Sequence, residues 1–135
     1  LGHAPAPMRA LLGDPVDPEL FHYFGIQVGD DGDWALRREF GLGNLDRASL
    51  PTGPVHLHFD LDVLDPAEFP YLAYTDGKLA IEDAINLVGE IAKDSDLVGL
   101  TITEFSPATD DDARAGSEVI ARLCEAALAQ QGSLA

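Results

Sequence analysis

The chain lacks the features that cross-link secreted proteins or anchor proteins in membranes. A single cysteine, Cys124, excludes an internal disulfide and a cysteine-based zinc cluster. Its position in a helical pattern is typical of a small buried residue. No apolar run approaches the ~20 residues that cross a bilayer. Residues 1–10 also lack the basic-then-apolar order of a signal peptide. These absences predict a soluble, cytoplasmic protein.

Basic residues are scarce as well. Lysine and arginine total 8 against 24 aspartates and glutamates, which gives a formal net charge of −16 with histidine neutral. Nucleic-acid binding needs clustered cations that neutralise phosphates, and the chain has no basic run. Anionic membrane surfaces are disfavoured for the same reason. The charge therefore argues against nucleic-acid and membrane partners.

What the sequence does contain is an alternation of helical and strand patterns. Its 135 residues, 46% of them hydrophobic, can form one domain with its own core. We expect strands at 20–28, 55–64 and 97–105, and helices at 8–12, 34–40, 81–92 and 113–131. Asp33 is the expected N-cap of the second helix. Helices between successive strands imply a parallel sheet in an α/β architecture, with ligands at the carboxyl ends of the strands.

The most informative segment is Val55–Pro66, which reads Val-His-Leu-His-Phe-Asp-Leu-Asp-Val-Leu-Asp-Pro. Side chains of a strand alternate between its faces, so the apolar residues line one face and the histidines and aspartates the other. Asp60 and Asp62 come last, at the carboxyl end. Two carboxylates on one face repel each other unless a cation or a proton lies between them. A hard divalent ion is the natural compensation, so we predict that Asp60 and Asp62 are metal ligands.

Other interpretations of this segment stay open at this point. The aspartates could simply be hydrated acids of a solvent-facing edge strand. His58 could bind the metal, support one of the carboxylates or be a satisfied core histidine, and we favour the supporting role. His56, which lies deeper in the strand, is expected to be structural.

A second segment, Leu100–Pro107, ends the third predicted strand with an acid, Glu104. If the strands are parallel neighbours, Glu104 lies at the same edge of the sheet as Asp60 and Asp62. A carboxylate there can pair with a planar cationic group such as a guanidinium. The alternative is an exposed acid at the start of the last helix, beside the solvated and helix-capping run Asp110–Asp112.

These segments carry a resemblance. Asp60–Pro66, followed downstream by Val98–Pro107, resembles the carboxyl-terminal half of the arginase and agmatinase family, the ureohydrolases. Met8–Gly13 and Phe24–Gln27 resemble that family too, so the likeness covers nearly the whole chain. The resemblance implies a three-layer α/β/α fold with a parallel sheet. It also implies that residues 1–135 form the carboxyl-terminal part of a single ureohydrolase-like domain, and the initial Leu1 agrees with a piece of a longer protein.

The family also implies an activity. Its members hydrolyse C–N bonds in small guanidino or amidino compounds and assemble as homo-oligomers. By this resemblance, Asp60 and Asp62 are Mn²⁺ ligands of a binuclear centre, and Glu104 contacts the cationic group of the substrate. Two bound ions supply a nucleophile at neutral pH by lowering the pKa of water.

The sequence departs from the family pattern at several places. It has neither the family's Asp-Ala-His-x-Asp motif nor the ligand histidine before it, so about half of the metal ligands are missing. Gln27 stands where the family usually has Arg. Residues 68–78 replace a loop rich in glycine and threonine. The chain therefore resembles a divergent member whose substrate could be a guanidino, amidino or formimino compound.

Two other functions are compatible with parts of the sequence. The first is a half-domain or fold relative without catalytic activity, which the missing ligands favour. The second is an aspartate-nucleophile phosphatase, because such enzymes hold magnesium with an Asp-x-Asp pair at a strand end. Those enzymes have Thr where this chain has Leu64, and neither Lys78 nor Lys93 lies in a suitable context. The phosphatase is therefore the weaker alternative.

Overall fold

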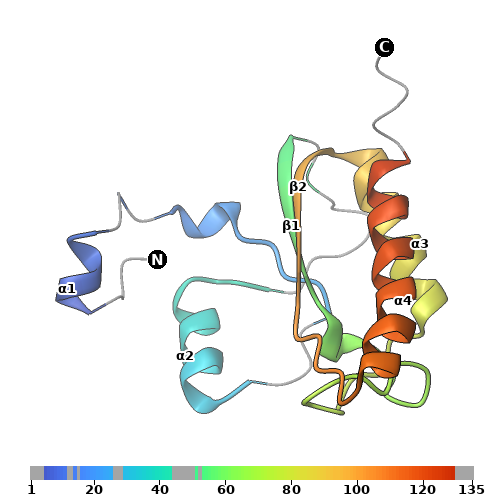
Figure 1. Ribbon diagram of the computed structural model, residues 1–135. Coiled ribbons are helices and arrows are strands. Elements are labelled where there is room, and N and C mark those ends of the chain that lie inside the picture. The colour runs from blue at the N-terminus through green and yellow to red at the C-terminus, as the bar shows by residue number, and fades with distance from the viewer. Residues whose placement is uncertain are drawn as a thin grey trace. The chain divides into compact units, whose positions relative to one another are not determined.

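A computed structural model describes residues 5–11, 14, 16–25, 29–43, 51 and 53–129 of the chain. It divides into two compact units, Leu1–Asp46 and Arg47–Ala135 (Figure 1). Throughout the described ranges, each helix falls short of the length and apolar character that a membrane span needs.

The first unit contains α1 (Ala6–Arg9), a short 3₁₀ helix (Pro18–Leu20) and α2 (Asp31–Glu39). The expected N-cap at Asp33 is wrong, because α2 begins earlier and Asp30 caps it. The Asp30 carboxylate accepts a hydrogen bond from the Asp33 amide at 2.9 Å, and the Asp33 carboxylate accepts one from the Asp30 amide at 3.0 Å. The two aspartates thus form a reciprocal capping box.

The strand expected at 20–28 is wrong for the part that the structure describes. Leu20 ends the 3₁₀ helix, and only Tyr23 forms an isolated β-bridge. Gly25 follows with a φ of +70°, which lies outside the conformation of a strand. The rest of that prediction, residues 26–28, lies outside the described residues.

The second unit is a β-α-β segment followed by a helix. Its elements are β1 (Pro54–Asp60), a 3₁₀ turn (Leu61–Val63), α3 (Ile81–Asp94), β2 (Asp96–Thr103) and α4 (Asp110–Leu128). The two strands pair in parallel, from Pro54 opposite Asp96 to Asp60 opposite Thr103. The parallel pairing and the two helices confirm the sequence prediction, but both strands end sooner than expected.

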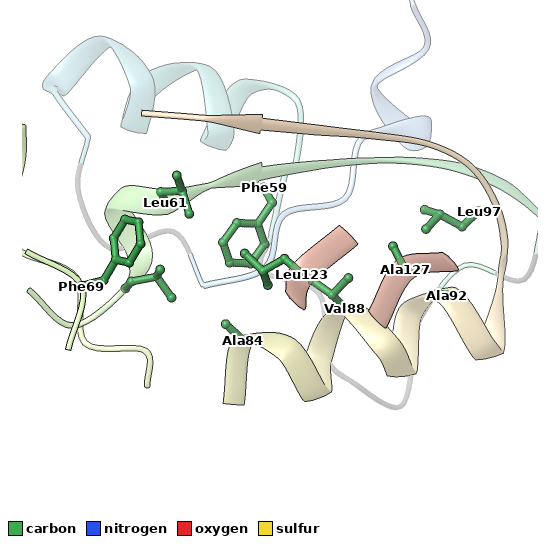
Figure 2. Close-up of a cluster of buried hydrophobic side chains, with 10 residues drawn as sticks. Phe59, Leu61, Phe69, Ala84, Val88, Ala92, Leu97, Leu123 and Ala127 are labelled. Carbon is green, nitrogen blue, oxygen red and sulfur yellow. The ribbon is translucent and has the colours of Figure 1, made fainter. Parts of the chain in front are cut away.

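Both helices lie on the same face of the two strands (Figure 1). Phe59 of β1 lies between the strand and the helices (Figure 2). Val55 and Leu57 of the same strand pack against this core. The largest fully buried side chains are Phe69, Leu61, Leu64, Leu123 and Val88. This core fixes the ends of β1 and β2, where the predicted site residues lie.

The start of α4 differs slightly from the sequence prediction. The helix begins at Asp110, and its N-cap is Thr109, whose hydroxyl accepts a hydrogen bond from the Asp112 amide at 3.1 Å. Asp110–Asp112 therefore form the first helical turn, where negative charge is stabilised by the helix dipole. The run has a structural role, as expected.

Candidate functional site

The two strands bring the predicted site residues to one edge of the sheet. Asp60 is the last residue of β1 and lies opposite Thr103, the last residue of β2. Glu104 follows Thr103 directly, and α4 begins only at Asp110. Glu104 is therefore a strand-end residue, and its interpretation as an acid of the helix start is wrong.

Asp62 lies in a turn and not, as expected, in the strand. The Asp60 carboxylate accepts a hydrogen bond from the Asp62 amide at 2.9 Å and caps the 3₁₀ turn Leu61–Val63. An aspartate side chain that bonds the backbone two residues on favours a turn over a continued strand. The strict alternation predicted up to Asp62 therefore stops at Asp60, although Leu61 still points into the core with no exposed surface.

The Asp62 carboxyl group has a shifted pKa. Burial raises its pKa, and the negative charges of Asp60 and Glu104 raise it further. A hydrogen bond from the backbone amide of Tyr74 opposes this shift. The Asp62 carboxyl thus lies within the field of two other acids, and one of its oxygens, Oδ1, is buried without a hydrogen-bond partner.

A buried carboxylate oxygen without a partner is costly, so such a group usually holds a proton or a cation. The donor set around Asp62 consists of carboxylate oxygens, which are ligands for hard divalent ions. The residues therefore fit a cation. Among the described residues, however, no three His, Cys, Asp or Glu side chains form a cluster that could hold a metal ion. Asp60 and Asp62 could supply only part of a ligand set.

Glu104 has an unusual backbone. Its φ is +66°, and within the described ranges it is the one residue other than glycine with a positive φ. This conformation is strained for a residue with a side chain and costs on the order of 1–3 kcal/mol. The side chain is exposed. Nothing in the sequence signals the strain, because glutamate rarely adopts this conformation.

The two histidines of β1 bond to the neighbouring strand. His56 Nε2 lies 2.8 Å from the Thr101 hydroxyl, and His58 Nε2 lies 3.2 Å from the Thr103 hydroxyl. The hydrogen bond that the structure gives His58 thus goes to a threonine and not, as predicted, to a carboxylate. The parallel register explains this, because it sets the threonines of β2 beside β1. The bond to Thr101 agrees with the structural role expected of His56.

Sequence reasoning missed the contribution of the segment after Asp65. This segment folds back onto the 3₁₀ turn, since the amides of Lys78 and Leu79 donate to the Val63 carbonyl at 3.1 and 2.9 Å. Gly77 is buried against the turn, and a Cβ there would lie 2.5 Å from the Val63 carbonyl carbon. The departure of residues 68–78 from the family pattern was visible in the sequence. The Tyr74 amide that reaches Asp62 was not.

The model of the Arginase family matches residues 6–129. A search of curated proteins returns no match. The solved structures similar to this chain include an arginase from Bacillus caldovelox, with a TM-score of 0.68 and 20% identity over 83% of this chain and 44% of that one.

Two further structures show the same likeness. An Entamoeba histolytica arginase in complex with L-ornithine has a TM-score of 0.73 and 15% identity, and the match covers 93% of this chain and 48% of that chain. A hypothetical agmatinase from Burkholderia thailandensis has a TM-score of 0.62 and 22% identity over 89% of this chain and 42% of its own. The chain thus spans less than half the length of these structures and has part of their α/β fold, as the sequence predicted.

Proposed function

The chain belongs to the arginase family, and from this premise we propose that the protein is a manganese-dependent hydrolase. It cleaves a non-peptide C–N bond in a small guanidino, amidino or formimino compound. The observation that carries the proposal is the half-buried Asp62 carboxyl group, which lies in the field of Asp60 and Glu104 and has one buried oxygen without a hydrogen-bond partner. A divalent cation at this position would satisfy that oxygen and offset the repulsion between the acids.

Asp60 and Asp62 would hold the metal in this proposal. When bound, a pair of manganese ions supplies a nucleophile at neutral pH by lowering the pKa of water. The Asp60 carboxylate also caps the turn through the Asp62 amide, so one side chain sets the position of the other. The remaining ligands would come from residues outside this chain, because the sequence has no Asp-Ala-His-x-Asp motif.

Glu104 would bind the substrate. Its side chain is exposed at the end of β2, and a carboxylate there can accept two hydrogen bonds from a planar cation such as a guanidinium. Such a charge-assisted interaction contributes about 1.5–3 kcal/mol. The L-ornithine complex of the Entamoeba histolytica arginase and the agmatinase likeness support substrates with a basic nitrogen group.

One observation favours a second candidate function, a fold relative that has no catalytic activity. Within the described parts of the chain, the acids at the strand ends do not form a cluster of three or more ligands. Two carboxylates alone bind a divalent ion weakly, because such sites take six or more oxygen ligands or several waters. The two functions differ in whether the natural protein retains manganese and turns over a substrate.

The experiment that tests the proposal uses the natural protein at its full encoded length. Arginine, agmatine and formiminoglutamate are incubated with it after chelator treatment, with and without added Mn²⁺, and the released product is measured. We expect turnover of one of these substrates only when Mn²⁺ is present. The manganese that the protein rebinds after Mn²⁺ addition is measured in parallel by elemental analysis. Rebound manganese without turnover of any of the three substrates would contradict the proposed reaction, and no rebound manganese would favour the non-catalytic relative.

A further inference from the structure

The strained backbone of Glu104 needs a physical cause in the surrounding structure. A non-glycine residue keeps a positive φ only where its neighbours fix the chain on both sides. On the amino-terminal side, β2 is held by its parallel pairing with β1 as far as Thr103. The residue that follows, Phe105, is the first candidate for the constraint on the other side.

Phe105 belongs to an aromatic cluster with Phe69 and Tyr71. Its ring centroid lies 6.1 Å from that of Phe69 and 6.4 Å from that of Tyr71, with the Tyr71 ring at 87° to it. Phe69 and Tyr71 also meet edge to face, with centroids 5.1 Å apart. Edge-to-face pairs of this kind contribute beyond their buried area, and Phe69 has no exposed surface. The cluster thus gives the Phe105 ring a fixed place.

The ring of Phe105 also lies directly against the backbone of α4. A Cβ at Gly116 would lie 2.6 Å from Phe105 Cζ and 3.0 Å from Tyr71 Cδ2, so only glycine leaves room for the ring. The next residue is fixed as well, because the Ser106 amide donates to the Tyr71 carbonyl at 2.9 Å. Phe105 is therefore held by its side chain and Ser106 by its backbone amide. Both follow Glu104 in the chain, whereas β2 precedes it.

We propose that Phe105 is a positioning residue that holds Glu104 in its left-handed conformation and so sets the direction of the Glu104 carboxylate. Its ring does this by packing against Gly116 and Tyr71. Thr103 is held by the sheet and Phe105 by the aromatic cluster and α4, so the chain between them must turn at Glu104. The effect on catalysis rests on the proposed function, but the effect on the backbone does not.

The first test measures the backbone effect through thermal unfolding of the natural protein. Glu104→Gly removes the strain, and we expect it to raise Tm by about 2–4 °C. Gly116→Ala displaces the Phe105 ring, so Glu104 relaxes in that background. In the Gly116→Ala protein, Glu104→Gly has no strain to remove. It only increases the conformational entropy of the unfolded chain, so it lowers Tm. The same Tm change in both backgrounds would overturn the proposal.

Two further variants keep this test decisive. If Gly116→Ala does not fold, Phe105→Leu loosens the same contact, and the same reversal in the sign of the Tm change is expected. Gly89→Ala is the matched control, because it also replaces a helical glycine but leaves the new Cβ 4.0 Å from Ala126. In the Gly89→Ala background, Glu104→Gly must raise Tm as it does in the unchanged protein. A reversal there too would contradict a role specific to Phe105.

The second test measures kcat/KM with the substrate that the natural protein turns over, because this value depends on the direction of the Glu104 carboxylate. We expect Gly116→Ala to lower kcat/KM about tenfold with unchanged manganese content, and Gly89→Ala to leave both near normal. When Glu104 is already replaced by Gln, Gly116→Ala should lower kcat/KM less than twofold, because the carboxylate whose direction it changes is no longer present. A full tenfold loss in that background would contradict the positioning role. If Glu104→Gln alone leaves kcat/KM unchanged, the substrate contact in the proposed function is wrong. The Tm measurements of the first test still decide the backbone effect in that case.

Discussion

At the scale of single residues, Asp62 shows how a backbone turn can set the chemistry of a site. Its amide is held by Asp60, its carboxyl accepts a hydrogen bond from the Tyr74 amide, and Oδ1 is buried without a partner. The segment that carries Tyr74 can approach because Gly77 has no side chain. Gly77, which has no side chain, therefore supports the arrangement around Asp62.

Gly77→Ala tests this dependence. The new Cβ would meet the Asp62 and Leu64 carbonyl oxygens and lie 2.5 Å from the Val63 carbonyl carbon. These are backbone atoms of a short turn, so the segment must move away and the Tyr74 hydrogen bond to Asp62 is lost. We expect Tm to fall by several degrees and bound manganese to decrease, as measured by calorimetry and elemental analysis.

Gly53→Ala is the control for this substitution, because no atom lies within 4 Å of a Cβ at that position. We expect Gly53→Ala to leave both Tm and manganese content near those of the unchanged protein. Equal effects of the two substitutions would show that the close approach at Gly77 does not support the site.

At the scale of secondary-structure elements, α4 covers one face of the β1–β2 pair and contacts α3. Leu123 is the large side chain of α4 that is almost completely buried, at 1% exposure. Leu123→Ala removes apolar contacts and leaves a cavity, so we expect the free energy of unfolding to fall by about 2–5 kcal/mol. Chemical denaturation of the natural protein measures the change.

The matched control is Leu128→Ala in the last turn of the same helix. Leu128 is 64% exposed, and a substitution there should change the free energy of unfolding by less than about 0.5 kcal/mol. Similar losses for the two variants would mean that the core lies elsewhere.

The elements also show what the sequence could and could not predict. The helices α3 and α4 were predictable because their apolar residues recur with helical spacing and face one core. The end of β1 was not, because the Asp60 side chain competes with strand pairing by capping a turn. The strand expected at 20–28 failed in its described part because an aromatic run alone does not outweigh Pro18 and Gly25.

The site could be predicted in part for a similar reason. Parallel strands bring their carboxyl ends together, so Asp60 and Glu104 could be assigned to one edge from the alternation of elements. The positive φ of Glu104 and the seat of Phe105 on Gly116 depend on contacts between distant segments. No pattern within one segment predicts such contacts.

At the scale of the whole molecule, the net charge of −16 of this chain is compatible with the cationic substrate proposed above. An acidic protein attracts small cations and raises their local concentration. The assembly into homo-oligomers stays a prediction from the family resemblance. The central claim is that Asp60 and Asp62 hold metal while Glu104 binds the substrate without holding metal.

The measurement that tests this claim most directly is the manganese content and kcat/KM of Glu104→Gln and Asp62→Asn in the natural protein. Asp111→Asn serves as a control for the lost charge, because the Asp111 side chain is 90% exposed. The account predicts that Glu104→Gln keeps its manganese while kcat/KM falls roughly ten- to hundredfold, and that Asp62→Asn loses its manganese. Loss of manganese from Glu104→Gln, or full manganese and activity in Asp62→Asn, would contradict the account.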